Sequence, residues 1–215
     1  MAKSNLSIEL VDTDRVIVAK INKALAKEIN SKMLKKVSLI KSMLKPVIAT
    51  ALFSSPEIIS LGSGVLRFDF GIPDDPAAAI ADMIANSLQF NYSKVRLRGK
   101  NLAGGLTITL QPTDYTLLRT SSVGMTETED GDVLPWLDWL LTLGDSIIIV
   151  NFGVQYGPYG RTGGARMVPT SKNPSIRPFQ VNPNYSGNEA DNFITRAIAA
   201  QAGPIRTLIM NTLRG

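Results

Sequence analysis

The chain has 215 residues, of which 44% are hydrophobic and 19% are charged, and its formal net charge is +5. It contains neither cysteine nor histidine. Thiol nucleophiles, Cys/His zinc sites, Ser-His-Asp triads and imidazole proton shuttles are therefore excluded, and only chemistry based on carboxylates, lysine or magnesium stays open.

The length and composition are those of a globular chain that buries a core without disulfides or metal. No stretch reaches the roughly 18 to 20 uninterrupted apolar residues of a membrane span, and the first residues lack the apolar segment of a signal peptide. We therefore expect a soluble product of the cytoplasm without membrane contact. The positive net charge favours an acidic partner.

Helical spacing of apolar residues predicts two consecutive helices near the start of the chain. The first runs from Asp14 to about Met33, and the second runs from about Leu34 to Phe53, with a kink or break at Pro46. The two helices carry eight lysines, while Glu28 is the one acidic residue beyond the first N-cap. We therefore assign residues 1–55 to a basic helical arm and residues 56–215 to an α+β core.

Short elements of mixed type are predicted next. In chain order they are a brief helix at Ser55-Pro56, a strand through Val65, Arg67 and Asp69, a helix from Pro76 to Leu88, a hairpin from Phe90 to Leu110 with the loop KNLAGG, and a strand near Tyr115 to Thr120. The elements after a polar, acidic loop at residues 121–132 are a helix from Leu134 to Leu143 starting at Pro135, the most apolar strand from Ser146 to Tyr156, a loop at about 157–187, a helix from Asn188 to Gln201, and a short helix after Gly203-Pro204. Together they predict an α+β fold in which an antiparallel sheet of about four strands is covered by helices.

A row of four basic residues lies in the predicted hairpin, formed by Lys94, Arg96, Arg98 and Lys100. Alternation along a strand places all four on one face, with Val95 and Leu97 toward the core. Such a row suits contact with DNA phosphates, as in the wall of a channel through which a genome passes. The alternatives are a solvated face, or pairing with the acidic loop around Glu127 to Asp132 of the same or an adjacent subunit.

Two other segments resemble ion sites but lack the required spacing. The acidic run ETEDGD has no distal bidentate Glu, so we interpret it as a solvated loop rather than a calcium site. The segment GPYGRTGGAR has glycines and arginines but no Gly-Lys-Ser/Thr ending, so the phosphate-loop and dinucleotide fingerprints both fail.

The long loop at about 157–187 is typical of a functional segment. We interpret it as an assembly loop that orders against neighbouring subunits, the alternative being a flexible surface loop. Its candidate polar anchors are Arg161, Arg166 and Arg177, and its candidate apolar anchors are Met167, Ile176 and Phe179.

The helix predicted at Leu134 is apolar nearly all round, and it carries Trp136 and Trp139 three residues apart. Such a helix is either central in the core or has one face buried against another chain. Both tryptophans are therefore candidates for a subunit interface as well as for the core.

The last third of the chain carries LPWLDWLLTLGD, SIIIVNFGVQYG, a Gly/Arg-rich loop and NEADNFITRAIAAQ in that order. This order, with Tyr156-Gly157, Arg161-Thr162-Gly163 and Arg177-Pro178-Phe179, resembles structural proteins of tailed-bacteriophage particles of the neck, head-to-tail connector and tail-completion type. The resemblance implies a virion protein made in the host cytoplasm. It further implies a non-enzymatic ring subunit of six or twelve copies, without a cofactor, that touches portal or adaptor, tail terminator or tail tube, and packaged DNA.

Three other functions stay open. The first is a tail terminator or another tail- or capsid-associated virion protein, which differs only in the ring that it touches. The second is a non-specific DNA-binding protein that uses the basic helices and the basic row. The third is a metal-dependent enzyme such as a nuclease, for which Asp69, Asp74, Asp75 and Asp82 could be recruited.

Overall fold

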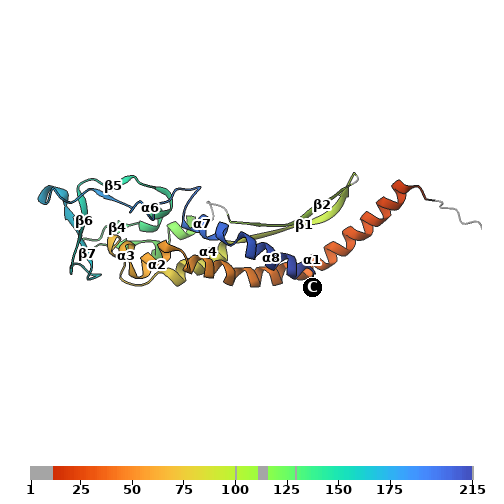
Figure 1. Ribbon diagram of the computed structural model, residues 1–215, viewed down its shortest axis with the longest axis horizontal. Helices are drawn as coiled ribbons and strands as arrows, with labels where there is room; N and C mark the ends of the chain where they lie inside the picture. Colours follow the sequence, from red (N-terminus) through yellow and green to blue (C-terminus); the bar gives the residue numbers. More distant parts are fainter. Residues whose placement is uncertain (1–11, 100, 111–115, 129, 215) are drawn as a thin grey trace, which may run out of the picture.

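The computed structural model describes residues 12–99, 101–110, 116–128 and 130–214. The molecule is elongated, with one long helix, α1, running along most of its length and small β-sheets at one end (Figure 1). Of the described residues, 52% are helical, and the sheets that they form are antiparallel. The helices are α1 (Asp14–Phe53), α2 (Pro56–Ser63), α3 (Val65–Asp69), α4 (Ala77–Ser87), α5 (Thr116–Arg119), α6 (Trp136–Thr142), α7 (Phe193–Ala200) and α8 (Ala202–Arg214).

Helix α1 is a single helix of 40 residues, so the predicted division near Met33 and Leu34 is wrong. The junction residues are all good helix formers, and Met33 is itself buried. Pro46 lies inside the helix, where it removes one backbone hydrogen bond. Burial of Leu44 and Ile48 on either side of Pro46 holds the helix together through this point.

The segment from Val65 to Asp69 is helix α3, not the predicted strand. Leu66 and Phe70 are both buried, and their spacing of four residues suits one face of a helix rather than one face of a strand. Ser60 fixes the turn before α3, because its hydroxyl accepts a hydrogen bond from the Leu66 N–H at 3.0 Å. Helix α5 likewise replaces the strand predicted near Thr116.

Four separate two-stranded sheets take the place of the predicted four-stranded sheet. The strands are β1 (Gln89–Arg98), β2 (Asn101–Thr109), β3 (Thr126–Glu127), β4 (Val133–Leu134), β5 (Ile147–Ile149), β6 (Phe152–Tyr156), β7 (Ala165–Pro169) and β8 (Phe179–Gln180). They pair antiparallel as β1 with β2, β3 with β4, β5 with β8, and β6 with β7. The hairpin from Phe90 to Leu110 is confirmed, although its turn lies at Gly99 and not in the predicted KNLAGG loop.

The strand predicted from Ser146 to Tyr156 is broken into β5 and β6, which belong to different sheets. The loop at 157–187 supplies the partner of each, β8 and β7, so this loop is partly folded within its own chain. Gly153 in β6 makes that arrangement feasible, because a Cβ at this position would lie 2.0 Å from the Arg177 carbonyl oxygen.

The core lies between the second half of α1 and helices α2, α3, α4, α6 and α7. An aromatic cluster occupies its far end, where the Phe70 and Trp136 rings stack with centroids 5.7 Å apart. Phe179 meets Phe70 edge-on at 6.1 Å and lies 6.0 Å from Trp139. Helix α6 was predicted almost to its bounds, and its apolar character is explained by the burial of Trp136, Leu137, Leu140 and Leu141.

The C-terminal helices differ slightly from the prediction. Helix α7 begins at Phe193 rather than Asn188, because Asn192 forms a capping box with Thr195. Helix α8 begins at Ala202 and includes Gly203-Pro204, so the break between the two helices falls at Gln201. Arg196 ties α7 to α2 through an ion pair of 2.7 Å with the buried Glu57.

Within the described ranges, no single helix is long and apolar enough to cross a membrane. Helices α1 and α2 together meet the length and composition criteria, as a pair bent by 66°.

Candidate functional site

The β1–β2 hairpin is fastened to α1 by one side chain, that of Asn30. The amide nitrogen of Asn30 donates to the Val95 carbonyl at 2.9 Å, and its amide oxygen accepts from the Val95 N–H at 2.8 Å. The Tyr92 hydroxyl donates to the same oxygen at 2.5 Å. Asn30 therefore pairs with Val95 as the backbone of a third strand would.

Val95 needs that partner because the hairpin contains a bulge. The register shifts between Ser93 and Arg96, so two residues of β1 face one residue of β2 and part of the ladder is lost. The opposing residue is Gly104, with a φ of +125°, and a Cβ there would lie 2.7 Å from the Lys94 carbonyl oxygen. The side chain of Asn30 thus satisfies backbone groups that the bulge leaves unpaired.

The structure supports the basic row in part. Lys94, Arg96 and Arg98 are exposed on the hairpin, while Lys100 lies outside the described residues. Val95 is buried as predicted, but Leu97 is 38% exposed, because the bulge interrupts the alternation on which the prediction relied. Within the described ranges, none of the three basic side chains forms an ion pair.

Charge is divided sharply between two parts of the chain. Residues 14–53 and 89–109, which form α1 and the hairpin, carry 13 Lys and Arg against Asp14 and Glu28. Residues 54–88 and 110–215 carry 9 Lys and Arg against 14 Asp and Glu. We call the first part the basic surface, and its positive field exceeds what the net charge of the whole chain suggests.

The first half of α1 exposes large apolar side chains. Val18, Ile21 and Leu25 are 48%, 53% and 47% exposed. Further along the same helix, Lys36 donates to the Leu213 carbonyl and Met43, which is still 41% exposed, accepts from the Thr212 hydroxyl, so α8 packs against that stretch. The spacings from 18 to 25, 25 to 36 and 36 to 43 are seven and eleven residues, close to whole helical turns.

It follows that Val18, Ile21 and Leu25 lie on the face of α1 that α8 covers further along. We call these three residues the apolar stripe. Among the described residues, they form the exposed continuation of the helix face against which α8 packs.

The acidic tip is the short β3–β4 hairpin, with Glu127, Asp130 and Asp132 exposed around its turn. Val133 is 56% exposed and is the cross-strand partner of Glu127. Among the described residues, none of these three carboxylates takes part in an ion pair. The β4 and β7 strands lie at the end of the molecule opposite the start of α1 (Figure 1).

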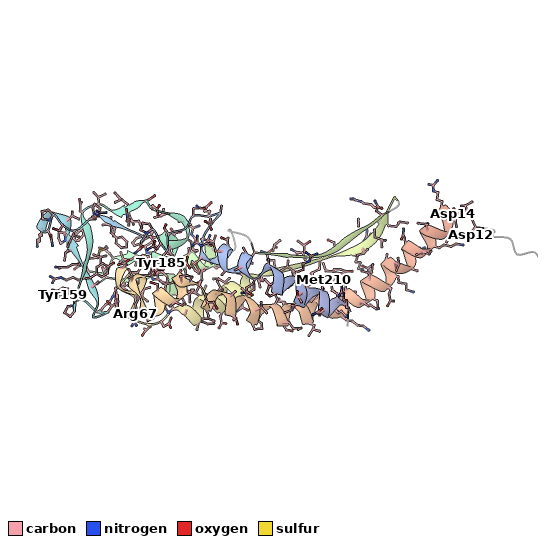
Figure 2. The ribbon with its side chains drawn as sticks, viewed as in Figure 1. Asp12, Asp14, Arg67, Tyr159, Tyr185 and Met210 are labelled. Atoms are coloured by element: carbon pink, nitrogen blue, oxygen red, sulfur yellow. The ribbon has the colours of Figure 1, made fainter. Side chains whose placement is uncertain are left out.

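The predicted loop anchors have different environments. The Arg161 guanidinium donates to the Glu127 carbonyl, and Arg166 lies over the Tyr159 ring at 4.4 Å while donating to Gln155 at 3.1 Å. These two arginines therefore fold the loop onto its own chain. Figure 2 shows Tyr159 at the far end of the molecule from Asp12 and Asp14.

Two of the predicted interface residues are core residues. Phe179 is 3% exposed and Trp136 is fully buried, so in this conformation neither offers a surface to a neighbour. Trp139, Met167 and Ile176 are half-buried, and Arg177 is exposed. The sequence does not distinguish a core position from an interface position here, because both positions require large apolar side chains.

A carboxylate site that the sequence did not single out as such lies between α3 and β6. Asp69 is 8% exposed and accepts a hydrogen bond from the Tyr156 hydroxyl. Burial raises the pKa of Asp69 to about 6, although the hydrogen bond from Tyr156 opposes the shift. The two residues border a pocket of about 350 Å³, also lined by Arg177 and Gln180.

This pair fixes β6 to α3, and nothing in it is arranged as a metal site. No group of three His, Cys, Asp or Glu residues within the described ranges could hold a metal ion. The pocket instead presents one carboxylate, one phenol and one guanidinium, and Ile147, Val154 and Phe179 form its apolar part.

Comparison with protein-family models, with curated proteins and with solved structures finds no match for this chain.

Proposed function

We propose that this chain is a structural subunit of a tailed-phage virion that forms a ring in the neck, of the head-to-tail connector or tail-completion type. The ring would hold six or twelve copies, join portal or adaptor to tail, and leave a channel for DNA. The observation that carries the proposal is the apolar stripe, a helix face that the chain covers with α8 further along and leaves open at Val18, Ile21 and Leu25. Exposed apolar faces of this kind are typical of surfaces that bind another protein.

The shape of the molecule supports the same proposal. A 40-residue helix carries the stripe and the basic hairpin at one end, and a separate folded end lies far from them. Subunits with different surfaces at their two ends associate head-to-tail, and such contacts close into rings when the rotation between copies permits it. The resemblance to phage neck proteins, carried by residues 134–198, supports the particle that we propose and is the basis for the proposed position.

The folded loop is the part that we propose for contact with the next ring. Its exposed Arg177 and half-buried Met167 and Ile176 lie near β6 and β7, at the end opposite the stripe. Arg161 and Arg166 would act indirectly, by holding the loop in shape.

Electron microscopy of the native particle, or of a co-expressed set of virion proteins, tests the proposal. Density for this chain in a ring between portal and tail is the expected result. Density in a ring at the end of the tail or on the capsid would favour the tail-terminator or capsid-associated alternative instead. Absence of the chain from every particle would overturn the structural proposal.

Non-specific DNA binding is a second candidate, favoured by the charge of the basic surface. If it is correct, the affinity of the free protein for duplex DNA falls steeply as salt increases. Replacing Arg96 and Arg98 by glutamate should then reduce the slope of log affinity against log salt concentration. The reduction should correspond to the loss of about two phosphate contacts. An affinity that does not respond to salt would contradict this candidate.

A further inference from the structure

We propose that the basic surface of one copy docks onto the acidic tip of the next copy, so that copies associate head-to-tail. The contact would pair Lys94, Arg96 and Arg98 with Glu127, Asp130 and Asp132 of the neighbour. This inference deepens the proposed function and rests on its premise that copies of the chain self-associate.

Charge complementarity is the first argument. Basic and acidic residues are concentrated in different parts of the same chain, and on neither side do the named side chains have an ion-pair partner within the described ranges. Neighbouring like charges repel one another unless opposite charges lie close to them. Complementary charged patches accelerate and orient the association of two proteins. A second copy supplies the opposite charge without any further protein.

The apolar residues give the second argument, because they distinguish a protein partner from DNA. Leu97 is 38% exposed between Arg96 and Arg98 on the hairpin, and Val133 is 56% exposed on the acidic tip. Both surfaces therefore combine apolar side chains with charge, as the core and rim of a protein interface do. A phosphate backbone would use the charges and leave the apolar side chains in water.

The placement of the two surfaces gives the third argument. The start of α1 lies at one end of the molecule and the β3–β4 hairpin near the other (Figure 1). A contact between the basic surface of one copy and the acidic tip of the next is heterologous when the copies follow one another, and it repeats along a ring or a filament. Two antiparallel copies would instead pair both surfaces at once and close as an isologous dimer. Sedimentation velocity distinguishes the two arrangements, because a dimer that grows no further would overturn the head-to-tail contact.

Carbodiimide cross-linking can detect this contact in the unmodified chain. The reagent joins an amine to a carboxylate that touches it, so Lys94 should become linked to Asp130 or Asp132. Protein labelled with ¹⁵N and mixed with unlabelled protein separates links between copies from links within one copy, because only the former give peptides of mixed mass. We expect mixed-mass links that disappear as salt is raised.

Charge reversal gives the decisive comparison. One variant carries Arg96→Glu with Arg98→Glu, and another carries Asp130→Lys with Asp132→Lys; all four side chains are exposed, so the fold should be retained. Each variant alone should associate at least tenfold more weakly in sedimentation velocity, whereas their equimolar mixture should recover the association of the natural chain. A control with Lys172→Glu and Arg206→Glu changes the net charge as much as the Arg96 and Arg98 variant does. Because both residues lie outside the proposed contact, the control should associate normally.

The outcomes separate this inference from the proposed function. Mixed-mass links together with rescue by mixing support the head-to-tail contact. Links that join two basic ends, failure of the mixture to recover, or a single-copy protein that binds duplex DNA would each overturn it. If the chain is found in a neck ring but gives no such links, the head-to-tail contact alone is overturned. If the links form but the chain is absent from every particle, the phage function alone is overturned.

Discussion

The core end, by which we mean the aromatic cluster and the residues packed on it, differs from the first half of α1 in how completely its apolar side chains are buried. Around the aromatic cluster, Trp136, Phe70 and Phe193 are at most 1% exposed. Along the first half of α1, Val18, Ile21 and Leu25 remain about half exposed. The aromatic cluster is thus packed within one chain, whereas the start of α1 leaves apolar side chains open to solvent, as Ile147, Val150 and Phe152 around β5 and β6 also do.

Removal of the Trp136 side chain is expected to have the largest effect. Trp136→Ala leaves a cavity between Phe70 and α6 and should lower the free energy of unfolding by about 3 to 5 kcal/mol, measured by urea denaturation. Trp136→Phe is the matched control, because it keeps an aromatic ring and removes a buried indole N–H that has no hydrogen-bond partner among the described residues. A loss below 1 kcal/mol for the alanine variant would mean that the core end is less complete than described.

The Asp69–Tyr156 pair should make the stability of the core end depend on pH. The pKa of Asp69 is raised to about 6 in the folded chain, so between about pH 4 and pH 6 the folded chain binds more protons than the unfolded chain. Stability should therefore fall as pH rises through this window, by up to about 3 kcal/mol. Asp69→Asn keeps an acceptor for Tyr156 and should abolish the fall attributable to this residue, which urea titrations at several pH values would detect.

Detaching the hairpin from α1 is expected to have an intermediate effect. Asn30→Ala removes the side chain that pairs with Val95 and leaves two backbone groups unsatisfied, at a cost of about 1 to 3 kcal/mol. Hydrogen exchange should accelerate in β1 and β2 but not around Trp136. Asn30→Asp keeps the acceptor and loses the donor, so protection near Val95 should be intermediate; equal exchange in all three proteins would refute the role of Asn30.

Polar substitution of the apolar stripe should have the smallest effect on a single chain. Ile21→Gln with Leu25→Gln replaces half-exposed side chains by another good helix former and should change stability by less than about 0.5 kcal/mol. Leu44→Gln, at a buried position of the same helix, is the control and should be severely destabilising. A large loss from the stripe variant would show that the stripe is covered within the chain.

Elements with a strong local pattern were predictable from the sequence. Helix α6, helix α4 and the hairpin appear within a few residues of their expected positions, because apolar spacing, Pro135 and the change to a period of two all act locally. The sequence also placed Lys94, Arg96 and Arg98 on an exposed hairpin.

Apart from the division of α1 near Met33, the main incorrect predictions depend on contacts between segments distant in the chain. The strand predicted through Val65, Arg67 and Asp69 is a helix, because burial of Leu66 and Phe70 outweighs the alternation. The single sheet became four pairs of strands, because the loop at 157–187 supplies β7 and β8. Neither the bulge at Ser93 nor its pairing with Asn30, 65 residues from Val95, has a local signal.

Because α1 is one continuous helix, its number of residues determines its length. A helix of 40 residues spans about 60 Å, and each added residue would lengthen it by about 1.5 Å and rotate everything before it by about 100°. The distance between Asn30, the stripe and the core end is therefore set mainly by the number of residues between them. In an assembly, the number of turns in α1 would therefore set the distance between successive contacts.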